Sequence, residues 1–308
     1  MRGGSQYTLA QRVPRPDQIV DCPLCGKSPA RVWRREQRWT VVRCRGCGLL
    51  RTWPPPDAQT LSSLYGSPDY YDARSMGASS EAAWVGRAGE IVGSLPRRPS
   101  SVLDFGAGEG HLVHALRARG LGAQGVEPFP AGRQAARERY GLELLDEVPA
   151  NRHFDLVTLV HALEHVPEPV STLVRLKDVL EPQGLAFIEV PNAASVDMRR
   201  SSRRREILDL PVHLFHFAPD TLVRVIERAG LKVLDLRLSN PDALEWLLAR
   251  RRPREAPPSA EPSVPASVAA APSGEGASFL RASWRRLLPW LRRRLPGSKI
   301  QAIAARAD

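Results

Sequence analysis

The chain has 308 residues and a formal net charge of +11, and this length allows a full hydrophobic core with additional segments. Residues 1–60 hold 11 basic and 4 acidic side chains and residues 241–308 hold 12 and 6, so residues 61–240 carry a net charge of −2. The sequence lacks both an apolar run of roughly 20 residues, as a membrane helix needs, and the apolar stretch of a signal peptide. These features argue against a membrane-spanning protein and a uniformly basic core, and they predict a cytoplasmic protein.

All four cysteines fall in two Cys-x-x-Cys pairs, Cys22 with Cys25 and Cys44 with Cys47. Each pair predicts a knuckle with two sulfurs on one side of a turn, and two knuckles supply the four thiolates of a closed, tetrahedral zinc site. A redox Cys-x-x-Cys would not need duplication. The sequence therefore predicts a structural zinc ribbon in a reducing compartment, with a hairpin over residues 31–42.

Beyond the ribbon, apolar periodicity predicts a helix over residues 81–95 and then alternating strands and helices. The predicted strands cover residues 101–105, 122–127, 142–145, 154–160, 184–190, 231–238 and 299–306. The further predicted helices cover residues 110–119, 131–140, 168–180 and 219–229. Alternation of this kind is typical of an α/β fold with a doubly wound parallel sheet.

A loop with glycine at every second position follows the first of these strands, at Gly106, Gly108 and Gly110. Glycine permits the sharp turn and lets a ligand approach the main chain, and such loops bind nucleotide-like ligands at the carboxyl end of a strand. The run Asp104-Phe-Gly-Ala-Gly-Glu-Gly resembles motif I of class I S-adenosylmethionine-dependent methyltransferases. A glycine-rich turn that binds no ligand is the alternative interpretation.

That resemblance implies a Rossmann-like, mostly parallel sheet of seven strands, in which the last strand is inserted antiparallel. It also implies S-adenosylmethionine as the cofactor, contacted by Asp104 and the three glycines. Glu127 ends the second strand about 20 residues after the loop, where an acidic residue can bind the ribose hydroxyls. An ordinary surface glutamate is the alternative interpretation of Glu127. Asp146 follows the third strand, where relatives hold the adenine amino group of the cofactor.

The run from the second knuckle through the prolines at 54–56 to Tyr70 and Tyr71 is a further point of similarity. It resembles bacterial methyltransferases that carry an N-terminal zinc ribbon and often act on sugars or other small metabolites. The resemblance implies that Tyr70 and Tyr71 lie over the cofactor. Ordinary packing of a connecting segment fits the same residues.

Two short segments hold four of the seven histidines. The strand at 154–160 runs into His161-Ala-Leu-Glu164-His165, and these ionisable groups are expected to face the crevice because burying them unpaired is costly. The string resembles the motif that follows the same strand in ubiquinone-type O-methyltransferases. His213 and His216 lie in a later loop that closes the substrate side of related enzymes.

Two chemistries fit these residues, and structural or substrate-orienting roles are the alternative to both. His165 or His213 can act as a general base for an acceptor hydroxyl, with His161 and Glu164 as further catalytic candidates. Alternatively, Glu164, His165 and His213 bind a divalent metal, because small-RNA 2′-O-methyltransferases and ubiquinone O-methyltransferases use a similar Glu-x-x-Glu-His arrangement. His161 replaces the first glutamate of that arrangement here, which favours the general base.

The remaining segments have distinctive compositions. Residues 198–206 are rich in arginine and fit either a mobile substrate flap or a solvated loop. Residues 253–276 are rich in Pro, Ala, Ser and Glu and predict a disordered linker. Residues 279–295 place leucines and Trp284 on one helical face among six arginines, which is typical of a helix that packs on its own domain or lies on an anionic membrane surface.

Three parts are therefore predicted. Residues 1–60 form a lead-in and the zinc ribbon, and residues 61–240 form a methyltransferase domain that residues 297–308 complete. Residues 241–296 insert a linker and a basic amphipathic helix before the last strand.

The predicted function is S-adenosylmethionine-dependent O-methylation of a small molecule, such as a sugar or a secondary-metabolite intermediate. One alternative is an rRNA or tRNA methyltransferase whose basic ribbon binds RNA. Another is sugar C-methylation, but relatives of that kind have a His-Glu-His string where this chain has Pro211-Val-His213. A non-enzymatic scaffold is disfavoured because Glu127 and the full glycine loop are both present.

Overall fold

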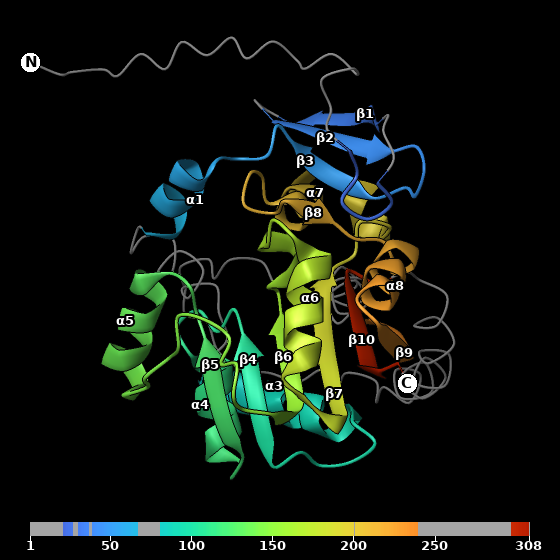
Figure 1. The fold of residues 1–308 in the computed structure, drawn as a ribbon. Coiled ribbons are helices and arrows are strands. Elements are labelled where there is room, and N and C mark those ends of the chain that lie inside the picture. Colours follow the sequence, from blue (N-terminus) through green and yellow to red (C-terminus); the bar gives the residue numbers. More distant parts are fainter. Residues whose placement is uncertain are drawn as a thin grey trace, which may run out of the picture.

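The structure is a computed structural model, and it describes residues 21–26, 30–36, 39–66, 81–199, 201–239 and 297–307. The predicted lead-in at 1–20, Tyr70 and Tyr71, and the linker and basic helix within 241–296 lie outside these residues. The described residues form two sheets, one large and one small, with helices around them (Figure 1).

The large sheet has six strands in the order β5-β4-β6-β7-β10-β9. Its strands are β4 (Ser101–Phe105), β5 (Gly122–Val126), β6 (Phe154–Val160), β7 (Leu180–Pro191), β9 (Leu231–Ser239) and β10 (Lys299–Arg306). β4 pairs in parallel with β5 and β6, and β6 pairs in parallel with β7, whereas β10 is antiparallel to both of its neighbours. The doubly wound, mostly parallel sheet and the antiparallel insertion of the last strand are thus confirmed.

The predicted third strand at 142–145 is wrong, since only Leu145 pairs, in an isolated parallel bridge with Val126. Its amide donates to the carbonyl of Gly125 at 2.9 Å. The side chain of Leu144 packs so closely on Gly125 that a Cβ there would lie 2.7 Å from it. This contact holds the segment against the edge of β5 as coil, so the sheet has six strands among the described residues and not seven.

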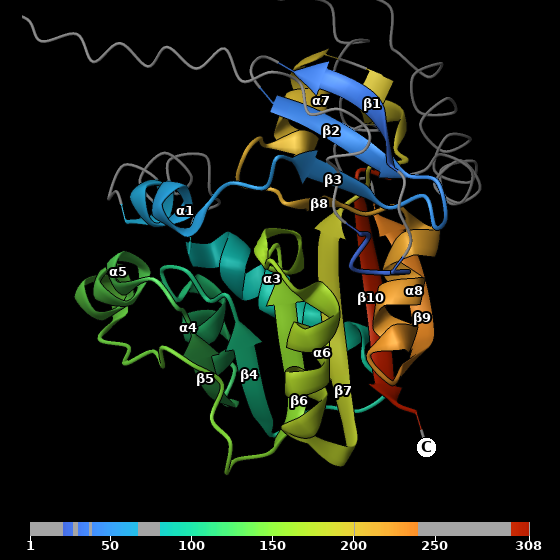
Figure 2. The same cartoon turned by 45° about the horizontal axis from the view of Figure 1, so that its top comes forward.

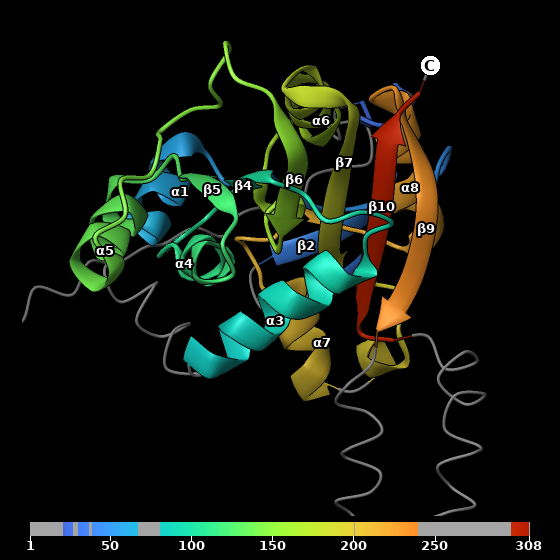
Figure 3. The same ribbon diagram turned by 90° about the horizontal axis from the view of Figure 1, so that it is seen from below.

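Helices cover both faces of the large sheet. Figure 3 shows α3 (Glu81–Ser94) and α4 (His111–Ala118) on one side and α6 (Pro169–Asp178) and α8 (Pro219–Arg228) on the other. Each pair buries its apolar face in a separate cluster, with Ile91 and Leu116 in one cluster and Leu173 and Val225 in the other. α5 (Pro130–Tyr140) begins with a proline and ends at Gly141, whose positive φ closes the helix.

The small sheet joins the two cysteine knuckles to a segment far away in the chain. It has the order β1-β2-β3-β8, all antiparallel, with β1 at Ala30–Glu36, β2 at Trp39–Cys44, β3 at Leu50–Trp53 and β8 at Phe215–His216 (Figure 2). The predicted hairpin is confirmed as β1 and β2. The pairing of β3 with β8 makes the histidine loop part of the same sheet.

Residues 198–206 are mostly helical, so the predicted solvated loop is wrong. They lie in a 3-10 helix (Val196–Arg199) and in α7 (Ser201–Leu208), apart from Arg200, which lies outside the described residues. Leu208 packs in a cluster with Val41 and Leu50 of the small sheet. The guanidinium of Arg204 donates to Glu36 of β1 at 2.7 Å. The helix forms because this sheet offers it both an apolar surface and a carboxylate.

The described part of the chain includes no helix with the length and apolarity that crossing a membrane requires.

Asp155 of β6 holds the start of β4 and provides a first test of the fold. Its carboxylate accepts from the amides of Ser100 and Ser101 at 2.8 and 3.1 Å. The hydrogen bond from the Ser100 hydroxyl, with those amides and Arg97, lowers the pKa of Asp155 well below its usual range. A carboxylate whose pKa is lowered by folding stabilises the folded state at pH values above its unfolded pKa of about 4. This contribution is lost as the pH falls below that value toward the pKa of the folded state.

We therefore expect Asp155→Asn to lower the free energy of unfolding by about 1–2 kcal/mol at pH 7. The difference from the native chain should narrow as the pH falls below about 4. Urea unfolding at several pH values measures both effects, with Glu181→Gln, an exposed carboxylate, as the control. A difference that stays constant down to pH 2 would contradict the assignment.

Candidate active site

A cavity of about 680 Å³ opens at the carboxyl ends of β4, β5 and β6. Its size lies within the range of about 300–1,000 Å³ that is typical of ligand pockets. The predicted site residues that line it are Asp104, Gly106, Gly108, Glu127, His161, His165 and His213. Gly110, Asp146 and Glu164 are not among its lining residues, and Asp146 is exposed to solvent.

The three loop glycines have different tasks, although all have a positive φ. A Cβ at Gly106 would lie 2.7 Å from the Cβ of Ala162, so glycine allows the loop to approach the segment after β6. A Cβ at Gly108 would meet no atom within 4 Å, so the backbone there borders open space in the cavity. A Cβ at Gly110 would lie 2.8 Å from Leu142, so this glycine serves packing. Gly108 therefore offers the main-chain surface that a cofactor needs.

Two buried carboxylates lie beside the loop. Glu127 accepts from the amides of Gly108 at 2.8 Å and Phe129 at 3.0 Å, and Asp104 accepts from the Thr158 hydroxyl at 2.7 Å. Burial raises the pKa of Asp104 to about 7, opposed by the Thr158 bond and aided by the charge of Glu127. Burial also raises the pKa of Glu127 against its amide bonds. Both are acceptors that suit ligand hydroxyl and amino groups.

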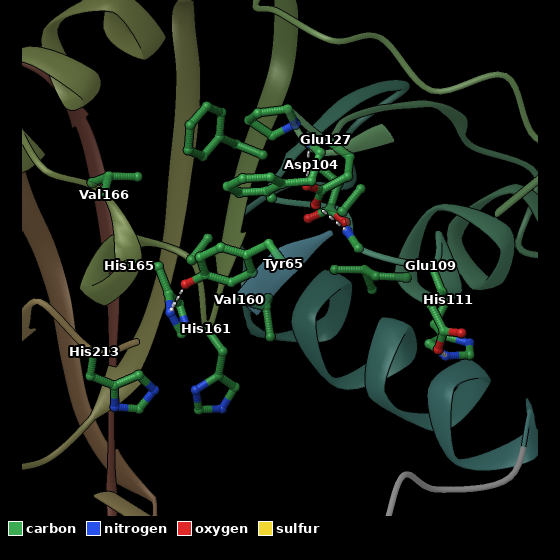
Figure 4. Close-up of a pocket in the computed structure, with 18 of the residues that line it drawn as sticks. Tyr65, Asp104, Glu109, His111, Glu127, Val160, His161, His165, Val166 and His213 are labelled. Atoms are coloured by element: carbon green, nitrogen blue, oxygen red, sulfur yellow. Dashed lines mark hydrogen bonds and ion pairs between the residues drawn. The ribbon is translucent and has the colours of Figure 1, made fainter. Parts of the chain in front are cut away.

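Tyr65, which ends α1 (Ala58–Tyr65), lies between the two sides of the cavity (Figure 4). Its ring stacks on Phe129 with centroids 4.4 Å apart, and its hydroxyl oxygen lies 2.8 Å from Nδ1 of His165. The sequence pattern predicted Tyr70 and Tyr71, and not Tyr65, as the tyrosines over the cofactor. The available signal was an aromatic residue at the end of a short helix that directly follows the prolines.

A second group of residues that the sequence did not predict lines the cavity at the start of α4. His111 places Nε2 2.9 Å from the carboxylate of Glu109 and Nδ1 2.7 Å from the hydroxyl of Tyr140. Trp84 stacks on the His111 ring at 5.4 Å, and Trp84, Glu109 and His111 all line the cavity. In the sequence, Glu109 lies within the glycine loop and His111 directly follows it. Their position in this motif was the signal that could have predicted them as residues of the cavity.

His161 has a φ of 55°, which is uncommon for a residue with a side chain. Its Nδ1 lies 3.2 Å from Glu164 and its Nε2 lies 3.3 Å from Glu189. Burial lowers the pKa of His161, but the hydrogen bonds that its ring donates to the two carboxylates outweigh this effect and raise the pKa to about 9. Glu189 is also paired with Arg87 and Lys299. His161 therefore bridges two buried carboxylates at the edge of the cavity.

His165 and His213 lie together on the side of the cavity away from Glu127, with ring centroids 4.7 Å apart (Figure 4). Nδ1 of His213 lies 2.9 Å from the carbonyl oxygen of Ile207, and Nδ1 of His165 lies 3.1 Å from that of Val212 and close to the Tyr65 hydroxyl. A carbonyl can only accept, so a ring nitrogen bonded to it carries the proton and leaves a lone pair on Nε2. Burial and the charge of His213 lower the pKa of His165 to about 4.

Glu164 lies behind these rings and is 1% exposed. Burial raises its pKa, but the hydrogen bond from His161 and the charges of His165 and His161 bring the pKa well below the usual range. Its Oε2 has no hydrogen-bond partner among the described residues. One potential ligand atom each from Glu164, His165 and His213 lies within 4.8 Å of the others, a set of donors that fits a divalent cation.

His216 does not line the cavity, contrary to expectation. In extended chain, side chains an odd number of residues apart point to opposite sides, so His216 faces the small sheet while His213 faces the cavity. Its Nε2 lies 3.1 Å from the hydroxyl of Thr52. Burial and the charge of His213 lower the pKa of His216 to about 3.

The four cysteines converge below the small sheet and form no disulfide. Cys22 and Cys47 place their sulfurs 3.5 Å apart, and Cys25 and Cys44 place theirs 3.6 Å apart. Each knuckle closes with a positive-φ glycine whose amide donates to the carbonyl of the pair's first cysteine, as Gly48 does to Cys44 at 3.0 Å. The predicted turn geometry of the knuckles is present.

Residues 82–236, half of the chain, match a family described as a methyltransferase domain. The chain is 28% identical over 188 residues to the ubiquinone biosynthesis O-methyltransferase of Dinoroseobacter shibae, which covers 55% of this chain and 75% of that protein. It is 31% identical over 153 residues to the protein of the same name from Aeromonas salmonicida, with 44% and 64% covered. The solved structure of a mitomycin 7-O-methyltransferase matches at a TM-score of 0.51 and 16% identity, over 80% of this chain and 60% of that one, and so shows the fold alone.

The family match spans the glycine loop, the acidic end of β5 and the histidine segment after β6. The fold around these segments is the doubly wound sheet with its antiparallel last strand. The chain therefore belongs to the methyltransferase-domain family and is a class I, S-adenosylmethionine-dependent methyltransferase.

Proposed function

We propose that this enzyme transfers a methyl group to a hydroxyl oxygen of a small, uncharged molecule. The observation that carries the proposal is that a single cavity is lined by the glycine loop and Glu127 on one side and by His165 and His213 on the other. Tyr65 contacts both sides. The relatives named ubiquinone biosynthesis O-methyltransferases support oxygen as the methylated atom.

The lining of the cavity favours an uncharged acceptor. Leu61, Val160, Val166 and Pro167 supply apolar surface, and no lysine or arginine occurs among the described residues of the lining. Phosphate and carboxylate groups are usually bound by such cations. His161, whose pKa is raised to about 9, also lines the cavity, but its ring is paired with Glu164 and Glu189. These features support a neutral small molecule over RNA as the group that enters the cavity.

When bound, S-adenosylmethionine supplies the methyl group from its sulfonium sulfur. Gly108 and Glu127 offer the main-chain surface and the acceptor that would hold it. The Nε2 lone pair of His165 or His213 accepts the hydroxyl proton, so the acceptor oxygen reacts as a stronger nucleophile. Such a base typically contributes about 10²–10⁴-fold, and holding the reactants in place can contribute up to about 7–11 kcal/mol.

We also propose a structural zinc at Cys22, Cys25, Cys44 and Cys47. Four Zn–S bonds of about 2.3 Å at tetrahedral angles set the sulfurs roughly 3.8 Å apart, and the observed 3.5 and 3.6 Å fit this arrangement. Four thiolates leave no open position for substrate. We propose a lead-in and zinc ribbon within residues 1–60 and a catalytic domain of residues 61–240 with 297–308, whose β8 completes the sheet of the ribbon.

A divalent metal at Glu164, His165 and His213 is the alternative to a general base. The unpartnered Oε2 of Glu164 supports it. Against it, His161 lies beside Glu164 at the position of the first glutamate in the metal-binding arrangement that this string resembles.

We expect EDTA to leave the rate of methyl transfer unchanged, because a histidine base needs no metal. Zinc is measured in the same samples by mass spectrometry, since the four cysteines hold their metal independently of the cavity. If EDTA lowers the rate at constant zinc content and Mg²⁺ or Mn²⁺ restores it, the reaction depends on a divalent metal in the cavity and not on a histidine base alone.

The small sheet favours RNA methylation as the second candidate. Arg31 lies directly opposite Arg43 across β1 and β2, and Arg45 is exposed on the second knuckle. Like charges at opposed positions in a sheet are unfavourable unless an anion lies against them, and RNA is a polyanion that would fit them.

The test is radiolabelled methyl transfer from S-adenosylmethionine to a mixed panel of acceptors. The panel holds catechol and neutral alcohols, a deoxysugar, a phenol that carries a carboxylate or phosphate, and bulk tRNA and rRNA. We expect label in a methyl ether of an uncharged acceptor. Label in RNA alone would favour the second candidate, and label on carbon would favour sugar C-methylation.

A further inference from the structure

The ribbon and the cavity meet at one buried hydrogen-bonded contact. Thr52 of β3 is 2% exposed, and its amide donates to the carbonyl of Leu214 at 2.9 Å. Its hydroxyl donates to the carbonyl of His213 at 2.6 Å. The same hydroxyl oxygen lies 3.1 Å from Nε2 of His216. The ribbon thus contacts the backbone of a histidine whose ring lines the cavity.

The chemistry of these three groups fixes the direction of the protons. The carbonyl of His213 can only accept, so the Thr52 hydroxyl spends its single proton there. The hydroxyl oxygen can then only accept from His216, whose ring must carry its proton on Nε2. The order is therefore His216 Nε2–H to Thr52 Oγ1–H to the carbonyl of His213.

This contact restrains His213 from the side opposite the cavity. The amide of His213 donates to Asp209 and its Nδ1 is bonded to Ile207, both at the end of α7 or directly after it. The next amide, of Leu214, donates to the carbonyl of Glu164 at 2.8 Å. The Thr52 hydroxyl holds the carbonyl of His213. Its loss would free the peptide that carries the ring.

We propose that Thr52, with its proton donor His216, is a positioning residue for His213, and that the zinc ribbon is in this way part of the support of the catalytic site. The inference rests on the proposed function for the role of His213, but the position of the ring is a separate property. Thr52 itself touches neither acceptor nor cofactor, because it does not line the cavity.

The test compares Thr52→Val, which keeps the shape and removes the hydroxyl, with Thr52→Ser, which keeps the hydroxyl. Thr40→Val is the control, because Thr40 is another buried threonine of the same sheet. Histidine ring 15N–1H spectra of the full chain report the tautomers, and the His213→Gln and His216→Gln variants assign the signals. Calorimetry with S-adenosylhomocysteine monitors the cofactor side.

In the native chain we expect one Nε2–H tautomer for His216 and one Nδ1–H tautomer for His213. Thr52→Val should shift the His213 signals and mix the His216 tautomers, whereas Thr52→Ser and Thr40→Val should keep the native spectrum. Cofactor affinity should stay within about twofold in all three variants. A native spectrum in Thr52→Val, or an equal change in Thr40→Val, would overturn the proposal.

The two proposals fail separately. If His213→Gln retains the native rate of methyl transfer while Thr52→Val still alters the His213 signals, the role of His213 as base is wrong and the positioning role of Thr52 stands. If His213→Gln loses activity while the Thr52→Val spectrum is native, the role of His213 as base stands and the positioning role of Thr52 is wrong.

Discussion

The His165→Gln variant should transfer methyl groups about 10²–10⁴ times more slowly than the native enzyme and bind S-adenosylhomocysteine with unchanged affinity. Glutamine keeps a polar side chain of similar length beside Tyr65 but has no basic nitrogen. The loss should therefore appear in kcat and not in cofactor binding. The measurement is the initial rate with an acceptor found in the panel, together with calorimetric titration of S-adenosylhomocysteine.

His213→Gln tests the second imidazole in the same way, because its Nδ1 is likewise bonded to a backbone carbonyl. If only one variant is slow, that histidine is the base and the other orients the acceptor. His153→Gln is the matched control, since His153 is exposed and does not line the cavity. Native rates in both His165 and His213 variants would remove the general base from the mechanism.

Cys47→Ser should remove about one zinc ion per chain and leave most of the protein insoluble or unfolded. Metal binding contributes about 10–16 kcal/mol to such sites, which is as large as the whole stability of a folded domain, about 5–15 kcal/mol. The side chain of Cys47 also lies in the same apolar cluster as Leu49 and Phe217, so the damage should reach the catalytic domain. Elemental analysis and the melting temperature measure the two effects.

Arg45→Ser is the control for this variant, because Arg45 is exposed on the same knuckle and is not a ligand. It should keep both the zinc and the melting temperature. A soluble Cys47→Ser protein with native stability and no bound zinc would show that the cysteines do not hold a structural metal.

Local sequence patterns were sufficient to predict the elements that form the core and the segments after strand ends that line the cavity. The glycine loop and His161, Glu164 and His165 lie within a few residues of strand ends, where the carboxyl edge of a parallel sheet collects them. The strand at 299–306 was recognisable from its apolar alternation. Its insertion between β7 and β9 followed from the family resemblance and not from the residues.

The residues that were missed depend on contacts between distant segments. Tyr65 contacts His165, which lies 100 residues away in the chain, and no local pattern places the end of α1 over Phe129. α7 has a weak apolar pattern and forms against the ribbon. The one-residue bridge at Leu145 depends on how closely Leu144 fits Gly125.

The pairing of β3 with β8 also constrains how the protein is made. The Thr52 hydroxyl and its acceptor on His213 are 161 residues apart, so β3 leaves the ribosome long before its partner strand exists. Until then, β3 presents an unpaired strand edge, the feature through which chains associate wrongly. The four cysteines are synthesised early, yet the sheet beside them is completed only when most of the catalytic domain has been synthesised.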